Sequence, residues 1–325
     1  MMRSALLRRA ARVGAAAAAV AATVALGGCS LMTPGLSEVE QRQASPAVSA
    51  PVIHEDGVLT VALDSADAPL AMVDGDNLLT GYSVDLAAAL ADEMGLDVRF
   101  VSASAATDGL SEKGADIYLS TASSEASADI DVVGTTMSNA TGVFTKAEGD
   151  IDASALPSDM ASATVAVQDQ SASQDILNRS GIGCQQSTYS NINECFEALD
   201  AGEVSYVVCE AVAGEYLARS YDGVKLAGTL DEAQNYGIAV SADNLDLSSA
   251  VTDALDSMTA DGTLSAVHAR WFGDSPLDLS SLQIPGITIQ EKETEGGLAE
   301  ASDQGAEEGD SEGSSSSDAS AEEAE

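Results

Sequence analysis

Val58-Leu-Thr-Val-Ala-Leu63 is a short apolar run with Gly57 before it and Asp64 after it. A run of this length between turn residues predicts a β-strand buried on both faces, as in a parallel sheet. An amphipathic helix is predicted next, with an apolar stripe made of Val84, Ala87, Leu90, Ala91 and Met94. Gly95 follows at the place where a helix C-terminus favours glycine. A strand followed by a helix is the building unit of an α/β fold.

The alternation of strands and helices continues along the chain in two groups. Further strands are predicted at residues 98–101, 116–120, 143–146, 164–168, 184–187, 204–209 and 236–240. Helices are predicted from about residue 171, around 192–199, and in two terminal segments around 251–258 and 264–271. We therefore predict two α/β lobes, the first made of residues 54–146 and 237–275 and the second of residues 147–236. Two crossing segments, near 143–146 and 235–238, would act as the hinge, and the ligand would bind between the lobes.

The beginning of the chain predicts export and lipid anchoring. Residues 1–28 have a basic start and an apolar run at 15–26, which is too short to span a membrane. The run ends in Leu26-Gly27-Gly28-Cys29, which resembles a bacterial lipobox. That resemblance implies cleavage before Cys29, a diacylglyceryl group on its sulfur and, in many bacteria, N-acylation, and several acyl chains anchor a protein stably. We expect residues 29–53 to be a flexible tether on the outer face of the cell membrane.

The end of the chain predicts a tail outside the fold. Residues 276–290 are interpreted as a C-terminal extension. Residues 291–325 contain 13 acidic residues and one Lys, together with a run of four serines, so they bury too little apolar surface to fold. We predict a solvated, disordered acidic tail.

The overall composition excludes several classes of protein. The 325 residues include 13 Lys and Arg against 53 Asp and Glu, a net charge of −40, so nucleic-acid binding is not expected. Only two His residues and no Cys-x-x-Cys pair are present, which argues against a zinc site and against a His-based catalytic triad. We expect no cofactor, no metal and no catalytic residue.

Residues 56–273 contain an ordered set of short motifs. They are Leu59-Thr-Val-Ala-Leu-Asp64, Gly81-Tyr-Ser-Val-Asp-Leu-Ala-Ala-Ala-Leu-Ala91, Leu110-Ser-Glu-Lys-Gly-Ala-Asp-Ile117, Thr121-Ala-Ser-Ser-Glu125, Ala198-Leu-Asp-Ala-Gly202, Tyr236-Gly-Ile-Ala-Val240, Asp261-Gly-Thr-Leu264 and Arg270-Trp-Phe-Gly273. In this order and spacing, they resemble the bacterial extracellular solute-binding proteins of family 3. The resemblance implies a two-lobed periplasmic-binding-protein fold of type II, without enzymatic activity. It also implies a polar-amino-acid receptor that closes over its solute and delivers it to an ABC permease in the membrane. We expect a monomer.

The binding site of this chain departs from the family pattern at one position. In the family, a cleft Arg just after the Thr-x-Thr-x-Glu stretch pairs with the α-carboxylate of the ligand, because guanidinium supplies two parallel hydrogen bonds. Here Thr121-Ala-Ser-Ser-Glu125 is followed by Ala126, and no Arg or Lys lies between Lys113 and Lys146. An α-carboxylate buried without a cation would be costly.

The other positions that the resemblance assigns to the site are mostly acidic or hydroxyl-bearing. They are Asp64, Asp67, Thr121, Ser123, Gln168, Ser171 and Glu210, the last of which would receive an amino group. We predict an amino-acid-like or cationic amine ligand, which the net charge would also attract. The alternatives are ordinary amino-acid binding with a displaced partner, a ligand-free sensor or interaction module, and an enzyme like the cyclohexadienyl dehydratases, which use cleft carboxylates as general acids.

Three cysteines follow Cys29, and one disulfide is permitted outside the membrane. Cys184 with Cys195 would close a short loop and contribute about 3 kcal/mol. Cys195 with Cys209 is the competing pair. We favour the first, which would leave Cys209 free beside Glu210.

Overall fold

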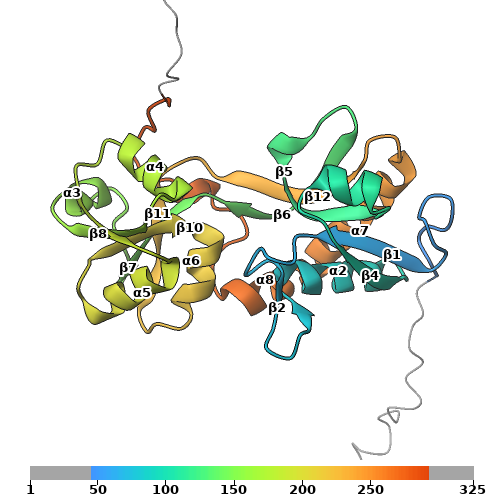
Figure 1. Ribbon diagram of the computed structural model, residues 1–325, viewed down its shortest axis with the longest axis horizontal. Helices are drawn as coiled ribbons and strands as arrows, with labels where there is room; N and C mark the ends of the chain where they lie inside the picture. Colours follow the sequence, from blue (N-terminus) through green and yellow to red (C-terminus); the bar gives the residue numbers. More distant parts are fainter. Residues whose placement is uncertain (1–44, 293–325) are drawn as a thin grey trace, which may run out of the picture. The chain divides into compact units, whose positions relative to one another are not determined.

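The computed structural model describes residues 45–292, and they contain two five-stranded sheets, each with its own helices (Figure 1). Within this range no helix is both long enough and apolar enough to cross a membrane. The predicted class, an α/β protein with two lobes, is confirmed by this topology.

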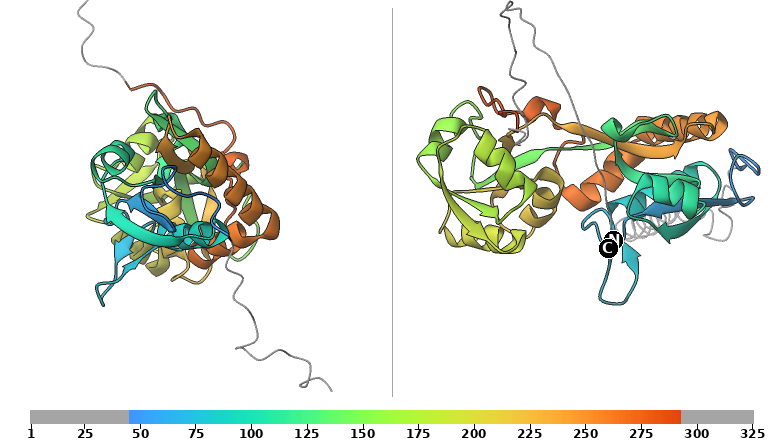
Figure 2. Two further views of the ribbon diagram at one scale, coloured as in Figure 1. Left: turned by 90° about the vertical axis from the view of Figure 1, so that its right-hand side faces the viewer. Right: turned by 45° about the horizontal axis from the view of Figure 1, so that its top comes forward.

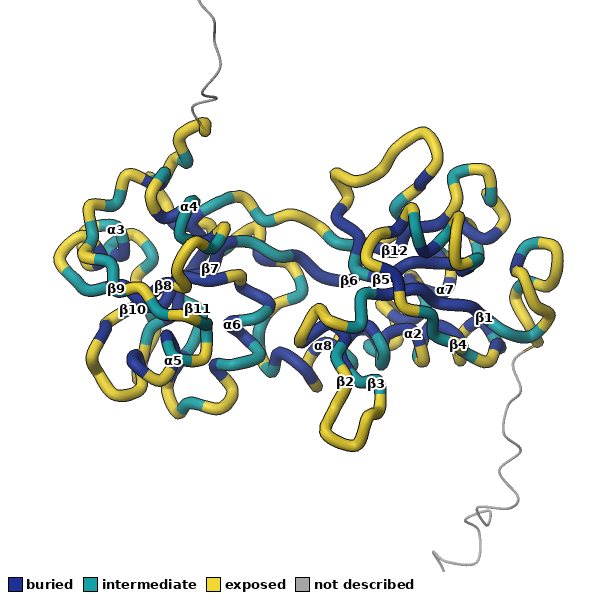
Figure 3. Tube along the Cα trace, in the orientation of Figure 1, coloured by how far each residue is buried: buried dark blue, intermediate teal, exposed yellow. Residues whose placement is uncertain are grey.

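The first sheet is built around the apolar run that opens the fold. Its strands, in spatial order, are β4 (Asp97–Ser102), β1 (Val58–Leu63), β5 (Ile117–Ala122), β12 (Gln234–Ser241) and β6 (Ile130–Asn139). β1 pairs in parallel with both neighbours and is buried along most of its length (Figure 3). Three helices pack together against this sheet: α2 (Tyr82–Glu93), α7 (Leu245–Asp261) and α8 (Thr263–Phe272). Gly95 follows α2 with a φ of +70°, so its predicted place at the helix end is confirmed.

The second sheet is packed on both faces. Its strands, in spatial order, are β11 (Val224–Thr229), β7 (Thr141–Lys146), β10 (Tyr206–Glu210), β8 (Thr164–Gln168) and β9 (Gln185–Tyr189). Its helices are α3 (Leu156–Ala161), α4 (Ala172–Arg179), α5 (Ile192–Ala201) and α6 (Ala211–Ala218). One hydrophobic cluster joins α5 and α6 to the sheet through Phe144 and Phe196, and another joins α3 and α4 to it through Met160 and Leu177.

The chain crosses between the sheets earlier than the sequence predicts. β6 ends at Asn139 in the first sheet, and β7 begins at Thr141 in the second, so the crossing is at Ala140. Residues 143–146, which we expected in the first lobe, instead pair with β10 and β11 of the second. The return crossing runs between β11 and β12, through residues 230–233. β6 and β12 lie side by side as long strands (Figure 2), and this pairing keeps the two crossings together.

Asp231 ties the two crossings to each other directly. Its carboxylate accepts hydrogen bonds from the backbone amide of Thr141 at 2.7 Å and from the Thr141 hydroxyl at 3.1 Å. The amide of Leu230 donates to the carbonyl of Thr141 at 2.8 Å. The hinge region is therefore a hydrogen-bonded pair of segments, shifted by a few residues from the predicted one.

The C-terminal segment is a third connection between the lobes. We call residues 274–289 the strap. The carbonyl of Leu277 accepts a hydrogen bond from the amide of Ser138 in β6, at 2.9 Å. Further along, Gln283 bridges to Thr229 at the end of β11, and Ile284 is buried in the core of the second lobe. The segment that we expected to be an extension is thus integral to both lobes.

The tether also ends earlier than predicted. Residues 47–53 pack on the first lobe, where the amide of Ala47 donates to the carbonyl of Met94 and Ile53 is buried. Next to them, the buried carboxylate of Asp116 accepts hydrogen bonds from the amide and the ring of His54. Residues 29–44, including Cys29, the signal segment before them and the acidic tail after Lys292 lie outside the described residues.

A few short elements complete the fold. β2 (Met72–Val73) and β3 (Leu79–Thr80) form a small hairpin before α2, and short helical turns are formed by Asp108–Glu112, Ser123–Glu125 and Ser280–Leu282. The hairpin follows a turn that begins at Asp64, so it belongs to the region where the predicted site residues lie.

Candidate functional site

The carboxyl ends of β1 and β5 meet at one edge of the first sheet. Asp64 follows β1 directly, and its carboxylate accepts a hydrogen bond from the amide of Ala66 at 2.9 Å. Ser120, in β5, has a φ of +59° and lies with its hydroxyl 2.7 Å from that of Ser83 at the start of α2. These elements enclose a small cavity lined by Leu63, Asp64, Asp67, Leu70, Ala71, Ser83, Tyr118, Leu119 and Ser120.

A second, adjoining cavity takes its walls from both lobes. It is lined by Asp67, Ala68, Pro69, Leu70, Met137, Asn139, Glu210, Val212, Ala213 and Tyr236. Asp67 and Leu70 line both cavities, so the two adjoin each other and are described as one candidate site. Of the predicted site residues, the structure brings together Asp64, Asp67 and Glu210.

Asn139 is a site residue that the sequence did not reveal. It stands at the end of β6, at the crossing, and its side-chain oxygen accepts hydrogen bonds from the amides of Ala140 at 3.0 Å and Val212 at 3.2 Å. Its amide nitrogen lies 3.5 Å from the carboxylate of Glu210 and donates to it. Asn139 therefore fixes the start of α6 and the orientation of Glu210 at once. No motif marks it, because its role depends on where the crossing falls.

The electrostatics of the site are those of several carboxylates held near one another. The pKa of Asp67 is raised by burial and further by the negative charges of Glu210 and Asp64. Burial and four neighbouring carboxylates, Asp64 first among them, raise the pKa of Tyr118 to about 12. The pKa of Tyr236 is also raised, by burial and by Glu210. These shifts place the carboxylates of both lobes within electrostatic reach of one small region.

No cation offsets this negative charge in the described walls of the site. The residues that line the two cavities include no Lys, Arg or His. Ala126, where the family Arg would stand, is an exposed residue whose amide donates to the carbonyl of Ser123 at 3.4 Å. A ligand placed here would meet carboxylates, a tyrosine edge and the Asn139 amide.

Thr121 and Ser123 belong to the same edge but do not line either cavity. Ser123 donates its hydroxyl to the carbonyl of Asn235 in the neighbouring strand, at 2.9 Å. Thr121 is 1% exposed, and its hydroxyl has no hydrogen-bond partner among the described residues. A buried hydroxyl without a partner is unusual in a folded protein.

Gln168 and Ser171 lie elsewhere in the second lobe, where Gln168 ends β8 and Ser171 stands just before α4. The Ser171 hydroxyl accepts from the amide of Gln174 at 3.1 Å and donates to the carbonyl of Gln168 at 2.8 Å, so it caps this helix. The structure does not bring these two residues into the acidic cavities. Their local contacts are those of a helix N-terminus.

The predicted disulfide between Cys184 and Cys195 is not formed, because the two side chains pack on different faces of the second sheet. Cys184 packs with the α3 and α4 cluster, whereas Cys195 is buried with Phe196 in the α5 and α6 cluster. All three cysteines of the described chain are free thiols. Cys209 shares the cluster of Cys195, and burial raises the pKa of both thiols, that of Cys195 to about 12.

Comparison with known proteins shows the family. The model of the bacterial extracellular solute-binding proteins, family 3, matches residues 59–274, about two thirds of the chain. The L-cystine-binding protein TcyJ of Escherichia coli is 26% identical over 230 residues, which are 68% of this chain and 85% of that protein. The fold resembles the unliganded, open L-cystine solute receptor of Neisseria gonorrhoeae, with a TM-score of 0.58 and 19% identity over 69% of this chain and 94% of that one.

A polar amino acid uptake binding protein from Streptococcus thermophilus gives a TM-score of 0.60 at 19% identity, over 69% of this chain and 88% of that one. Both structures show a likeness of fold to this chain. The family model matches residues of both lobes, and the two structures agree with the two-lobed α/β fold. The chain belongs to the bacterial extracellular solute-binding proteins of family 3.

Proposed function

We propose that this protein is the lipid-anchored solute-binding component of an ABC importer and that its ligand is a small organic cation. The observation that carries the proposal is the convergence of Asp64, Asp67 and Glu210 on cavities whose described walls hold no cation. An ammonium or guanidinium group bound between them would relieve the repulsion that raises the pKa of Asp67.

The same electrostatics disfavour a ligand whose anchor is an α-carboxylate. A carboxylate in this site would add a further negative charge to a region that already holds several. Its desolvation would not be offset by a guanidinium, because Ala126 stands at that position. An enzyme that acts on anionic cyclic acids would meet the same obstacle. Reversible binding of an amine is the activity that these groups support best.

The carboxylates also suggest how binding would drive closure. Asp64 and Asp67 belong to the first lobe, and Glu210 stands at the end of β10 in the second. A cation that contacts both sets would stabilise the arrangement in which they are close, by its differential affinity for that state. The rotation would take place at Ala140 and at residues 230–233, where Asn139 and Asp231 hold the crossings. The permease would then recognise the closed form.

Membrane attachment through Cys29 belongs to the same proposal. Its support is the Leu26-Gly27-Gly28-Cys29 motif after a basic and apolar leader. A monomer held by acyl chains on the extracytoplasmic face would deliver its solute to a permease in the same membrane.

L-cystine is the second candidate ligand, because TcyJ is named for binding it. Cystine carries two ammonium groups, which suit this site, and two carboxylates, which do not. If cystine binds, a group other than a cleft Arg must receive its carboxylates. The Asn139 amide and the hydroxyls of Ser83 and Ser120 are donors that line the site and could take that role.

Matched ligands would separate these candidates. We would measure calorimetric binding of agmatine against arginine, and of cadaverine against lysine, to the full chain in detergent, with L-cystine in parallel. Each pair differs only by the α-carboxylate. We expect each decarboxylated amine to bind at least as tightly as its amino acid. Tighter binding of the amino acids or of cystine by tenfold or more would contradict the proposed cation specificity.

Two variants would connect binding to the site. Glu210→Gln should weaken amine binding about tenfold or more, since it removes a charge-assisted contact. Asp92→Asn is the matched control, because Asp92 is an exposed carboxylate on α2 that lines neither cavity. Unchanged amine affinity in Glu210→Gln would argue against this anchor.

A further inference from the structure

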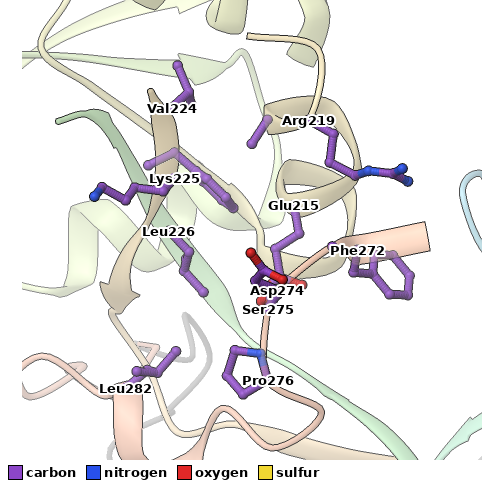
Figure 4. Close-up of a pocket in the computed structure, with 13 residues that line it drawn as sticks. Glu215, Arg219, Val224, Lys225, Leu226, Phe272, Asp274, Ser275, Pro276 and Leu282 are labelled. Atoms are coloured by element: carbon purple, nitrogen blue, oxygen red, sulfur yellow. Dashed lines mark hydrogen bonds between the residues drawn. The ribbon is translucent and has the colours of Figure 1, made fainter. Parts of the chain in front are cut away.

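A larger cavity lies away from the acidic site. Its volume is about 650 Å³, and it is enclosed by α6, β11, the end of α8 and the strap (Figure 4). None of its lining residues lines the two cavities of the candidate functional site. We call it the strap cavity. Its size is within the range of small-molecule sites, which is about 300–1,000 Å³.

The walls of the strap cavity are largely apolar. They include Phe144 and Leu226 from strands β7 and β11, Phe272 from the end of α8, and Leu282 from the strap. Phe144 and Phe272 belong to different lobes and are 0% and 3% exposed, so the accessible apolar surface of the cavity comes mainly from Leu226, Pro276 and Leu282. An apolar wall of this kind would accept the hydrocarbon or aromatic body of a ligand.

Glu215 places a buried carboxyl group in this apolar wall. It lies on α6, is 6% exposed, and lines the cavity. Its hydrogen-bond partner is the hydroxyl of Ser275 in the strap. Burial raises the pKa of Glu215 to about 7, and only the Ser275 hydrogen bond opposes the rise. The group is therefore partly ionised at neutral pH with no opposite charge to stabilise it.

The two cations at the rim of the strap cavity are engaged elsewhere. Arg219 donates to the carbonyls of Arg270 at 2.7 Å and Trp271 at 2.8 Å, at the end of α8. Lys225 donates to the carbonyl of Gly149 at 2.6 Å. Figure 4 shows both head groups directed away from Glu215, to opposite sides. No ion pair joins either of them to Glu215 within the described residues.

We propose that the strap cavity is a second binding site, for a small organic cation with an apolar body, such as an arylalkylamine. The ammonium group would pair with the Glu215 carboxylate, and the apolar body would contact Leu226, Pro276 and Leu282. A second acidic side chain at the rim, the exposed Asp274, also favours a cation over an anion. This site is independent of the ligand proposed for the cleft.

The test uses benzylamine, with benzyl alcohol as its uncharged counterpart, on the full chain in detergent. Calorimetry should detect benzylamine binding that strengthens about tenfold between pH 6 and pH 8, because Glu215 ionises over this range while the amine stays protonated. Benzyl alcohol should bind at least tenfold more weakly at pH 8. Equal binding of the two compounds, or benzylamine affinity that is the same at both pH values, would overturn the proposal.

Three variants assign the binding to the cavity. Glu215→Gln should lower benzylamine affinity tenfold or more, and circular dichroism would verify that it is folded. Asp274→Asn, in the exposed carboxylate of the same cavity, should have a smaller effect, and Asp92→Asn, in an exposed carboxylate on α2 that lines none of the three cavities, should have none. Loss of benzylamine binding in Glu210→Gln with retention in Glu215→Gln would overturn the proposal. If Glu215→Gln does not fold, the pH dependence of benzylamine binding to the unaltered chain tests whether Glu215 is the anchor.

Trp271 offers an independent readout, since it is the single tryptophan of the chain. Its carbonyl accepts from Arg219 at the rim, and its ring stacks on Tyr216 of α6 at a centroid distance of 6.0 Å. Benzylamine should change its fluorescence with the same midpoint as the calorimetric titration, also in the Glu210→Gln variant. A fluorescence response that Glu210→Gln removes would belong to the cleft and count against the proposal.

Discussion

The acidic cleft and the strap cavity each hold a carboxyl group with a raised pKa, but the surroundings of the two groups differ. Asp67 is an exposed residue of the cleft wall, and the charges of Glu210 and Asp64 add to the effect of its partial desolvation. Glu215 is buried among apolar side chains, and burial is the only cause of its shift. The comparison teaches that repulsion can be relieved by mutating a charged neighbour, whereas desolvation persists as long as the groups that cover the carboxyl stay in place.

The largest expected effect is on the stability of the protein through Glu215. Its pKa is about 7 in the folded protein and 4.5 ordinarily, so the folded state holds more protons between these pH values. The free energy of unfolding should therefore fall as the pH rises from about 4.5 to 7, by about 3 kcal/mol. Urea unfolding of the Glu215→Gln variant should lack this fall and give higher stability at pH 8. A variant with the same pH profile as the unaltered chain would contradict the burial argument.

The next prediction separates the two causes of a raised pKa. Replacement of both neighbours, Asp64→Asn with Glu210→Gln, should lower the pKa of Asp67 and leave that of Glu215 unchanged. Carboxyl-carbon NMR titration would measure both groups in one sample. Asp92→Asn is again the control, since Asp92 is not among the causes of either shift. A shift in Glu215 equal to that in Asp67 would break the distinction between the two regions.

A smaller effect concerns the contact that joins α6 to the end of α8. Arg219→Met removes two hydrogen bonds to the carbonyls of Arg270 and Trp271 but keeps the apolar length of the side chain. We expect a loss of about 1 kcal/mol in the free energy of unfolding, because the head group is exposed. Lys225→Met, at the opposite rim, removes one such bond and should cost less. Equal stability of the two variants would contradict the prediction that the two hydrogen bonds of Arg219 stabilise the protein more than the one of Lys225.

The smallest expected effect is that of salt on the two ligands. Between about 50 and 500 mM NaCl, agmatine binding to the cleft should weaken several-fold, because its carboxylates act together and are partly open to solvent. Benzylamine binding to the strap cavity should weaken less, because a buried pair is screened less. Calorimetry at a series of salt concentrations would measure both slopes. A steeper slope for benzylamine would reverse the comparison.

The elements that the sequence predicts well are those whose pattern is local. β1 is an unbroken apolar run, and α2 has a complete apolar stripe, so both are found where expected. β6 was not predicted, because Gly134 has a φ of +65° and the pairing with β12 is irregular beside Gly237, which interrupts the alternation. The strap was taken for an extension because its partners, Ser138 and Thr229, are remote in sequence.

The same distinction holds for the functional residues. Asp64 and Glu210 each follow an apolar strand, so their place at a sheet edge can be predicted from the run before them. Glu215 cannot be found this way, because it stands in an ordinary helical segment and becomes buried only under the strap. Asn139 cannot be predicted from the sequence either, because its contacts depend on where the chain crosses between the lobes.

The strap also constrains the order in which the protein can fold during synthesis. The first sheet needs β12, and the core of the second lobe needs Ile284, near the end of the described chain. Neither lobe is therefore complete when its first strands leave the ribosome, although domains commonly fold as units from the N-terminus. Both lobes reach their final packing only after residue 284 has been made. A nascent chain stalled just before that residue would expose an unfinished core in the second lobe.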